Sequence, residues 1–167
     1  MGDKVRRYHI GFHAIEHDDI PPGILTYDQL ATDEIQFEIP ICLLPGRYTG
    51  LALDSTGLKV DTPTLYLISA ELLKHAKHAY FEIAFDVFAT TAGSFDVILR
   101  DVTAAADVTT ITIDSGTSLK RTRSADILAS LTSGNEVGVQ LNVTTAAATG
   151  ESGDLIDAKL IVVLGIA

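Results

Sequence analysis

Three histidines near the N-terminus lie four residues apart and are the first candidates for chemistry. His9, His13 and His17 would share one face of a helix, where they could bind a metal ion. On a β-strand the same spacing separates neighbouring histidines by about 13 Å, which is too far for one ion. The alternating apolar residues from Val5 to Ala14 favour a strand. We therefore expect outward-facing histidines without a metal, unless symmetry-related chains share a site.

Acidic residues are the second candidates. Glycoside hydrolysis needs two carboxyl groups about 5–9.5 Å apart. Most acids of this chain fall in expected turns, where Asp is favoured for backbone reasons, so we expect no catalysis. Carboxylates and carbonyls in turns could instead bind calcium, which takes several oxygen ligands. The best calcium candidates are Asp101, Asp107, Asp154 and Asp157. A glycoside hydrolase ranks third among the functions considered.

The aromatic side chains and the single cysteine give little further evidence of a binding or catalytic site. The chain has five tyrosines and no tryptophan, which weakens a sugar-stacking platform, so we expect half-buried strand tyrosines. The tyrosines are Tyr8, Tyr27, Tyr48, Tyr66 and Tyr80. Cys42 has no second cysteine to pair with, and its apolar neighbours predict a buried, inert thiol. No nucleophile elbow, phosphate-binding loop or Cys-x-x-Cys motif is present in the sequence.

Composition narrows the class of protein. The chain has 167 residues and a net charge of −10, which fits one domain and argues against nucleic-acid binding. Hydrophobic residues make up 47%, yet no apolar run approaches the roughly 18 residues of a membrane helix. The excess apolar content must lie in a core or between subunits. Met1 to Gly11 does not resemble a signal peptide, so we expect either an intracellular or virion-associated protein or one whose leader has been removed.

The first half of the chain reads as strands broken by turns. Besides the strand at Val5 to Ala14, we expect a short helix at Thr26 to Leu30. Strands are predicted over Ile35 to Leu44 and Arg47 to Leu53, and Pro40 indicates an edge position or a bend. Leu65 to Leu73 is ambiguous: a strand ending near Glu71 is favoured, and a short helix over Ala70 to His78 is the alternative.

The second half alternates apolar and polar residues, which is typical of antiparallel strands with one buried face. A strand and its turn recur about every 8–12 residues, as in a β-sandwich. The predicted strands are Ala79 to Ala89, Ser94 to Asp101, Val108 to Asp114, Ser118 to Ile127, Glu136 to Thr145 and Asp157 to Ile166. Turns between them include Gly150 to Gly153.

These strands carry a resemblance to a known kind of module. The segments Phe95 to Thr103, Ser124 to Ile127 and Val137 to Leu141 are the clearest part of it, and it extends over residues 80–163. This region resembles a jelly-roll-type β-sandwich of the kind found in carbohydrate-binding proteins and in virus or phage structural proteins. The resemblance implies an all-β, jelly-roll-like antiparallel sandwich and transfers no site residues. We expect one domain over 1–167, with 1–60 as N-terminal strands and extension packed on a 65–167 sandwich.

The last strand suggests what the protein does. Leu160, Val162 and Leu164 fall on one face, and Ile161 and Val163 fall on the other. A strand with one wet face should not be apolar on both. We expect the N-terminal arm or a second subunit to cover Ile161 and Val163. The sequence thus predicts a non-catalytic structural protein that forms a homo-oligomer, in a virion or surface complex; the alternative is a carbohydrate-binding module.

Overall fold

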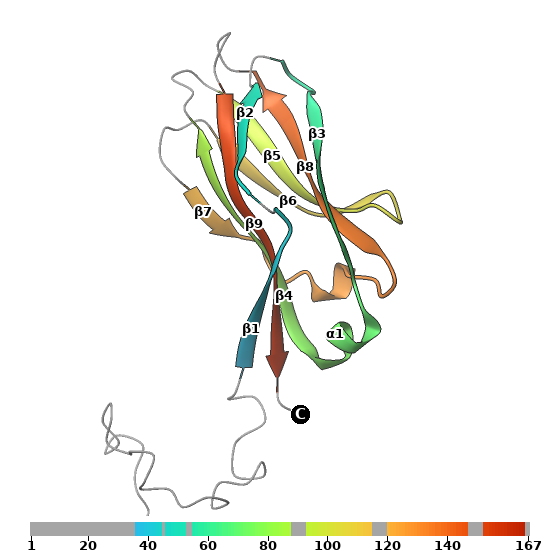
Figure 1. Ribbon diagram of the computed structural model, residues 1–167. Coiled ribbons are helices and arrows are strands. Elements are labelled where there is room, and N and C mark those ends of the chain that lie inside the picture. Colours follow the sequence, from blue (N-terminus) through green and yellow to red (C-terminus); the bar gives the residue numbers. More distant parts are fainter. Residues whose placement is uncertain are drawn as a thin grey trace, which may run out of the picture.

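The computed structural model describes residues 36–44, 46–52, 55–87, 93–114, 120–146 and 152–165. Two antiparallel sheets pack against each other, as Figure 1 shows. The predicted all-β, jelly-roll-like antiparallel sandwich is therefore confirmed. The predicted strand at Val5 to Ala14, the helix at Thr26 to Leu30 and the three histidines of the first segment lie outside the described residues.

The first sheet is built around β9, the longest strand. Its path runs β1-β9-β4-β7, and β2 pairs with the first part of β9 on the same side as β1. The strands are β1 (Gln36–Cys42), β2 (Tyr48–Ala52), β4 (Ala76–Val87), β7 (Lys120–Arg123) and β9 (Ser152–Gly165). Of the two positions expected from Pro40, an edge or a bend, the edge is what the structure shows, because β9 is the one described strand that pairs with β1.

The second sheet has the order β3-β8-β5-β6. Its strands are β3 (Lys59–Leu67), β5 (Ser94–Asp101), β6 (Ala106–Asp114) and β8 (Glu136–Thr145). Both β5 and β8 coincide with the predicted strands residue for residue. Alternation explains why. Phe95, Val97 and Leu99 of β5 are buried on one face, and the polar residues Asp96 and Arg100 lie on the other face together with Ile98.

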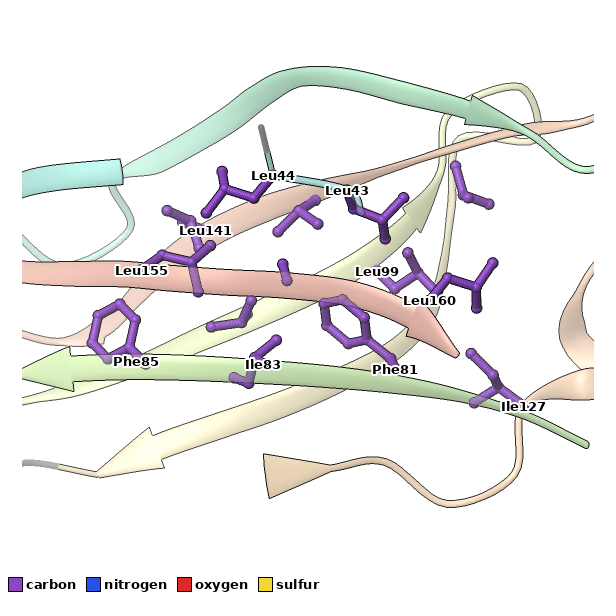
Figure 2. Close-up of a cluster of buried hydrophobic side chains, with 14 of the residues drawn as sticks. Leu43, Leu44, Phe81, Ile83, Phe85, Leu99, Ile127, Leu141, Leu155 and Leu160 are labelled. Atoms are coloured by element: carbon purple, nitrogen blue, oxygen red, sulfur yellow. The ribbon is translucent and has the colours of Figure 1, made fainter. Parts of the chain in front are cut away.

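The core lies between the two sheets (Figure 2). Phe81, Ile83 and Phe85 of β4 point into it together with Leu155 and Leu160 of β9. The Phe85 ring lies 4.7 Å from the Phe95 ring, centroid to centroid, so the two sheets meet through aromatic contact. Truncating a buried phenylalanine of this kind typically costs about 3–5 kcal/mol.

The favoured strand over Leu65 to Leu73 is wrong beyond Leu67. Residues Ala70–His75 form helix α1, whose first turn is capped by the Ser69 hydroxyl accepting from the Leu72 amide at 3.2 Å. The alternative helix is therefore correct, although it ends at His75. In the part of the chain with described structure, no helix is long and apolar enough to cross a membrane.

The predicted strand Ser118 to Ile127 is also too long, because β7 ends at Arg123. Beyond it, the Ser124 and Ile127 amides still donate to the Phe81 and Ala79 carbonyls of β4, each at 2.8 Å. Side chains, however, take over as acceptors: Ser124 Oγ accepts from the Phe81 amide at 2.9 Å, and Asp126 Oδ1 accepts from the Ala79 amide at 3.0 Å. The chain then forms a short 3₁₀ helix at Leu128–Ser130. Side-chain acceptors of this kind compete with a strand ladder.

The start of the last strand is a further correction. The sequence predicts Ser152 and Gly153 in a turn, yet they belong to β9 and pair with Ala52 and Leu51 of β2. The strand continues past Ile156, where a register shift opposite β4 marks a bulge. The strand β9 pairs with three neighbours, β1, β2 and β4, and is therefore the central strand of the first sheet.

Both faces of β9 are buried within the single chain. Leu160 and Val162 are in the core, and Ile161 and Val163 on the outer face are each only 4% exposed. The sequence predicts that the N-terminal arm or a second subunit covers this face. The burial of Ile161 and Val163 in one chain means that a second subunit is not needed for it. Tyr80 lies beside Ile161 in the sheet register, so the chain's own side chains crowd this face.

Candidate functional site

Exposed apolar side chains gather in two places on the described residues. Five large hydrophobic residues have exposed fractions between 39% and 56%. Phe37 and Ile39 lie on β1, and we call them the β1 patch. The other three lie at one end of the second sheet: Leu65, Leu67 and Val102. Contiguous exposed apolar surface marks interaction sites more often than scattered residues do.

The second group borders a hollow of about 350 Å³, which we call the Gly138 hollow. Gly138 on β8 pairs with Leu65 on one side and Arg100 on the other, so it lies between β3 and β5. A Cβ atom at this position would lie 2.7 Å from Leu65 Cδ2 and 3.8 Å from Val102 Cγ2. The absence of a side chain on Gly138 therefore leaves the hollow open.

A bulge in β3 shapes one wall. The register with β8 shifts between Asp61 and Leu65, so the intervening residues are out of the regular ladder. Pro63 has no amide hydrogen and fits this place on an edge strand. Asp61, Thr62 and Pro63 all line the hollow as a result, together with Leu65 beyond the bulge.

Polar groups stand at the margin of the hollow. Arg100 donates to Asp107 Oδ1 at 2.8 Å and to the Ala105 carbonyl at 3.2 Å, and Gln140 donates to Asp61 Oδ1 at 2.7 Å. Thr62 is 4% exposed, and its hydroxyl has no hydrogen-bond partner among the described residues. A buried hydroxyl without a partner costs free energy, and the fold bears this cost because the oxygen has less than 1 Å² of accessible surface.

The β1 patch lies at the end of the sandwich. Phe37 and Ile39 pair with Leu164 and Val162 of β9, which places them on the same side of the sheet as the core. They remain 56% and 39% exposed, so the second sheet does not cover them. Figure 1 shows β1 starting beside the end of β9, near the C-terminus.

The four calcium candidates lie as two pairs in different sheets. Asp101 and Asp107 belong to the β5–β6 hairpin, and Asp154 and Asp157 belong to β9. Each has protein partners. Asp101 accepts from the Ala104 amide at 2.7 Å, as well as from the Asn135 side chain at 2.7 Å.

The remaining three candidates bind cations of the protein itself. Asp107 pairs with Arg100, Asp154 pairs with Arg47, and Asp157 lies 2.5 Å from the Lys159 ammonium. Within the described ranges, no three or more His, Cys, Asp or Glu side chains are grouped so that they could hold a metal ion. Calcium binding stays a prediction of the sequence.

The three described tyrosines pack against other side chains of the protein. Tyr48 and Tyr66 are partly buried against the core. The Tyr80 ring has the Arg123 guanidinium 5.3 Å from its centroid and stacks with His78 at 6.1 Å. The expected half-buried tyrosines are therefore what the structure shows at these three positions.

Cys42 differs from its prediction. Its side chain is exposed, on the outer face of β1 opposite Lys159, and its thiol donates to the Leu44 carbonyl at 2.7 Å. The apolar residues that suggested burial, Leu43 and Leu44, turn into the core just after the strand ends.

Sequence reasoning missed the hollow. One signal for it exists: Gly138 stands between Val137 and Val139 within a predicted strand, and a lone glycine in a strand often marks a close approach. The partners of that approach, Leu65 and Val102, come from segments distant in sequence and could not be inferred.

Comparison with known proteins found similarity to solved structures only. No family model matches the sequence, and no curated protein is similar to it. Among solved structures, the CBM36-1 domain of a multidomain xylanase from the hindgut metagenome of Trinervitermes trinervoides is 17% identical, with a TM-score of 0.42. The match covers 76% of this chain and 96% of that domain.

Two further structures are similar at the same level. A carbohydrate-binding module CBM36 in complex with calcium and xylotriose is 11% identical, with a TM-score of 0.42 over 75% of this chain and 98% of that one. The structure of infectious bursal disease virus, Gx strain, is 11% identical, with a TM-score of 0.47 over 80% of this chain and 33% of that one. The strand orders of the two packed antiparallel sheets confirm the predicted resemblance to a jelly-roll-type β-sandwich module as a resemblance of fold.

Proposed function

We propose that this protein is a non-catalytic assembly protein whose copies bind one another to form a homo-oligomer. The observation that carries the proposal is the pairing of a hollow with a projecting patch on one chain. Apolar side chains, among them Leu65 and Val102, form part of the lining of the Gly138 hollow, and the β1 patch presents Phe37 and Ile39 elsewhere on the same molecule.

The cost of leaving these surfaces in water supports the proposal. Burying apolar surface is worth about 25 cal/mol per Å², so two exposed patches favour association. A net charge of −10 opposes association through repulsion between copies, and it also keeps a protein with exposed apolar patches from precipitating. A specific contact between apolar surfaces would let copies associate in spite of the repulsion between their negative charges.

The acidic residues fit a non-catalytic role. Asp101 holds a turn and Asp126 accepts from backbone amides, so both act as structural acceptors. Asp154 and Asp157 lie next to cationic side chains of the protein. The virion or cell-surface setting predicted from the sequence stays a prediction.

The test is the solution mass of the purified chain without added ligand, measured by light scattering from about 1 to 100 μM. We expect the mass to rise with protein concentration and to rise further when added salt screens the repulsion between acidic copies. A mass that stays at one chain over the whole range, at both low and high salt, would overturn the proposal.

A second candidate is ligand binding at the same hollow, with carbohydrate as the ligand class. The mixed lining of the hollow favours it, because Asp61 and Arg100 stand beside apolar side chains and a sugar offers hydroxyl groups beside an apolar ring face. Glycan-array screening followed by titration calorimetry tests this candidate. Binding by the wild type that is lost in Gly138→Ala would support it, and absence of binding to any glycan would exclude it.

A further inference from the structure

We propose that β6 of one copy pairs with β6 of a second copy, edge to edge and antiparallel, so that the second sheets of the two copies become one continuous sheet. This inference rests on the homo-oligomer proposed above and adds a place where two copies meet. The edge of β6 is a different surface from the β1 patch and from the Gly138 hollow.

The sequence of β6 suits a strand that is paired on both sides. Residues 108–113 are six consecutive β-branched residues, Val-Thr-Thr-Ile-Thr-Ile, without a charge, a proline or a glycine among them. β-Branched residues favour extended backbone and pack well against a neighbouring strand. An uncharged run of this length at a sheet edge is the kind of segment that adds another strand.

In the structure, β6 is paired on one side only. β5 is the one described strand that bonds it, and the ladder is regular from Thr109 opposite Leu99 to Asp114 opposite Ser94. A register shift at Arg100 leaves a bulge at the start of the strand, before this regular part. The peptide groups that point away from β5 are bonded by no other described strand and can accept a new one.

The other described edge strands carry features that hinder pairing. β1 and β3 contain Pro40 and Pro63, and proline has no amide hydrogen to donate. β2 has five residues and a register shift against β9, and β7 has four residues, among them Arg121 and Arg123. Prolines, short strands, irregular register and charged side chains all protect sheet edges. The regular part of β6 has none of these features.

One register uses the regular part of β6 best. A two-fold axis at Ile111 places this residue opposite its own copy, Thr109 opposite Ile113, and Thr110 opposite Thr112. Ile111 and Ile113 pack against the core, so the isoleucine pair lies on the core side of the joined sheet. The exposed hydroxyls of Thr110 and Thr112 meet on its outer side. Pairs of β-branched residues and pairs of threonines are favourable across a sheet.

The charges of β6 identify a second copy as the partner. Asp107 is already paired with Arg100 at 2.8 Å. In the proposed register Asp114 stands opposite Val108 of the second copy, and the two Asp114 residues lie at opposite ends of the contact. Neither acid faces another acid, which matters for a chain with a net charge of −10. The strand is thus complementary to itself in charge as well as in side-chain type.

A contact of this kind is closed. Both copies use the same edge, so a pair related by the two-fold axis leaves no β6 edge free. The contact therefore produces two chains, and anything larger requires a further surface. Residue 110 faces residue 112 of the other copy twice in each pair, which allows a test by charge.

The test uses two double variants. Thr110→Lys with Thr112→Lys places lysines directly opposite each other, and Thr110→Glu with Thr112→Glu does the same with carboxylates. Both threonines are exposed, so both chains are expected to fold with wild-type circular dichroism. Thr132→Lys with Ser133→Lys adds two lysines at exposed positions outside β6 and is the matched control.

We expect each β6 double variant alone to need a concentration about tenfold or more above that of the wild type to form pairs, because like charges directly opposite each other destabilise a sheet. The control should pair as the wild type does. Mixed in equal amounts, the two variants should form pairs of one lysine chain and one glutamate chain, because each lysine then faces a carboxylate. Sedimentation equilibrium of the separate and mixed chains measures these masses.

Cysteines test the register. Chains with Thr110→Cys and chains with Thr112→Cys, all with Cys42→Ser and with different tags, are mixed and oxidised. Directly opposite residues have Cβ atoms about 4.5–5.5 Å apart, whereas diagonal neighbours are about 7–8 Å apart. Disulfides should therefore form between the two kinds of chain and rarely within one kind.

The outcomes separate this inference from the proposed function. If the wild type is always one chain, both are wrong. If the wild type assembles and both β6 double variants assemble equally well, the homo-oligomer stands and the β6 contact is wrong. Folded variants that stay at one chain after mixing, or disulfides that form equally within and between the two kinds of chain, would also overturn the β6 contact.

Discussion

Arg123 on β7 forms an ion pair with Glu38 on β1, with 2.8 Å between Nη1 and Oε1, although β4 and β9 lie between these two strands. The same guanidinium contacts Glu82 of β4 at 3.0 Å. Glu38 stands opposite Val163 of β9 in the sheet register. The ion pair therefore crosses the outer face of the sheet and ties its first strand to its last.

This relationship accounts for the second buried face of β9. Ile161 and Val163 lie under a span of charged and aromatic side chains that includes Arg123 and Tyr80, whose ring lies 5.3 Å from Cζ of the guanidinium. The long aliphatic stem of an arginine can cover apolar surface while its charged end stays in contact with water. A single chain can thus bury apolar residues on both faces of one strand.

The first prediction concerns this span. Arg123→Ala should expose part of Ile161 and Val163 and lower the free energy of unfolding by about 1 kcal/mol. It should also speed hydrogen exchange of the β1 amides, because β1 loses its tie to β7. Urea denaturation and exchange mass spectrometry measure the two effects.

Arg121→Ala is the matched control, since Arg121 forms its ion pairs with Glu82 of β4 at 2.9 Å and with Asp157 of β9 at 3.8 Å. Its β1 exchange rates should equal those of the wild type. Equal exchange rates in Arg123→Ala as well would contradict the role assigned to the ion pair.

The second prediction concerns acid stability. The Ala79 amide, the His78 side chain and the Leu128 amide all bond the Asp126 carboxylate, and together they lower its pKa from 3.8 to about 2. A lowered pKa in the folded state means that the ionised carboxylate stabilises the fold above about pH 4. This contribution is lost as the pH falls from about 4 to about 2.

Thermal melts at about pH 6 and about pH 2.5 test the assignment. Asp126→Asn should melt at a lower temperature than the wild type at the higher pH. The difference should shrink at the lower pH, where the wild-type carboxylate is becoming protonated. A difference of the same size at both pH values would show that the charge of Asp126 contributes nothing to stability.

The third prediction separates a structural carboxylate from a calcium ligand. Asp101 is 5% exposed and accepts from the Ala104 amide and the Asn135 side chain. Removing the carboxylate leaves both donors unpaired, so Asp101→Ala should lower the free energy of unfolding by about 1–3 kcal/mol in buffer containing a chelator. Asp107→Ala, at an exposed ion pair, should cost less than about 1 kcal/mol. An effect of Asp101→Ala that appears only with added calcium would instead make Asp101 a ligand.

Strands with strict alternation are predictable from the sequence, and elements defined by distant partners are not. The bounds of β5 and β8 follow from their own sequences, because one face of each is apolar throughout. The end of β7 depends on Ser124 and Asp126 bonding amides of β4, which no local pattern reveals. Helix α1 has six residues, too few for its periodicity to stand out from an alternating segment.

The same distinction applies to the candidate site. The two apolar faces of β9 are visible in the sequence, but their cover is not, because it includes Arg123 from another strand, far from Ile161 along the chain. The Gly138 hollow depends on a register shift in β3 that places Leu65 beside Gly138. Sequence indicates which residues are apolar, and pairing across the sheet decides which of them meet.

The most direct test of the account is the solution mass of the wild-type chain without any ligand. Sedimentation velocity over a wide range of protein concentration should show species heavier than one chain, with a proportion that grows as the concentration rises. A sedimenting mass equal to one chain at every concentration, in both low and high salt, would contradict the account.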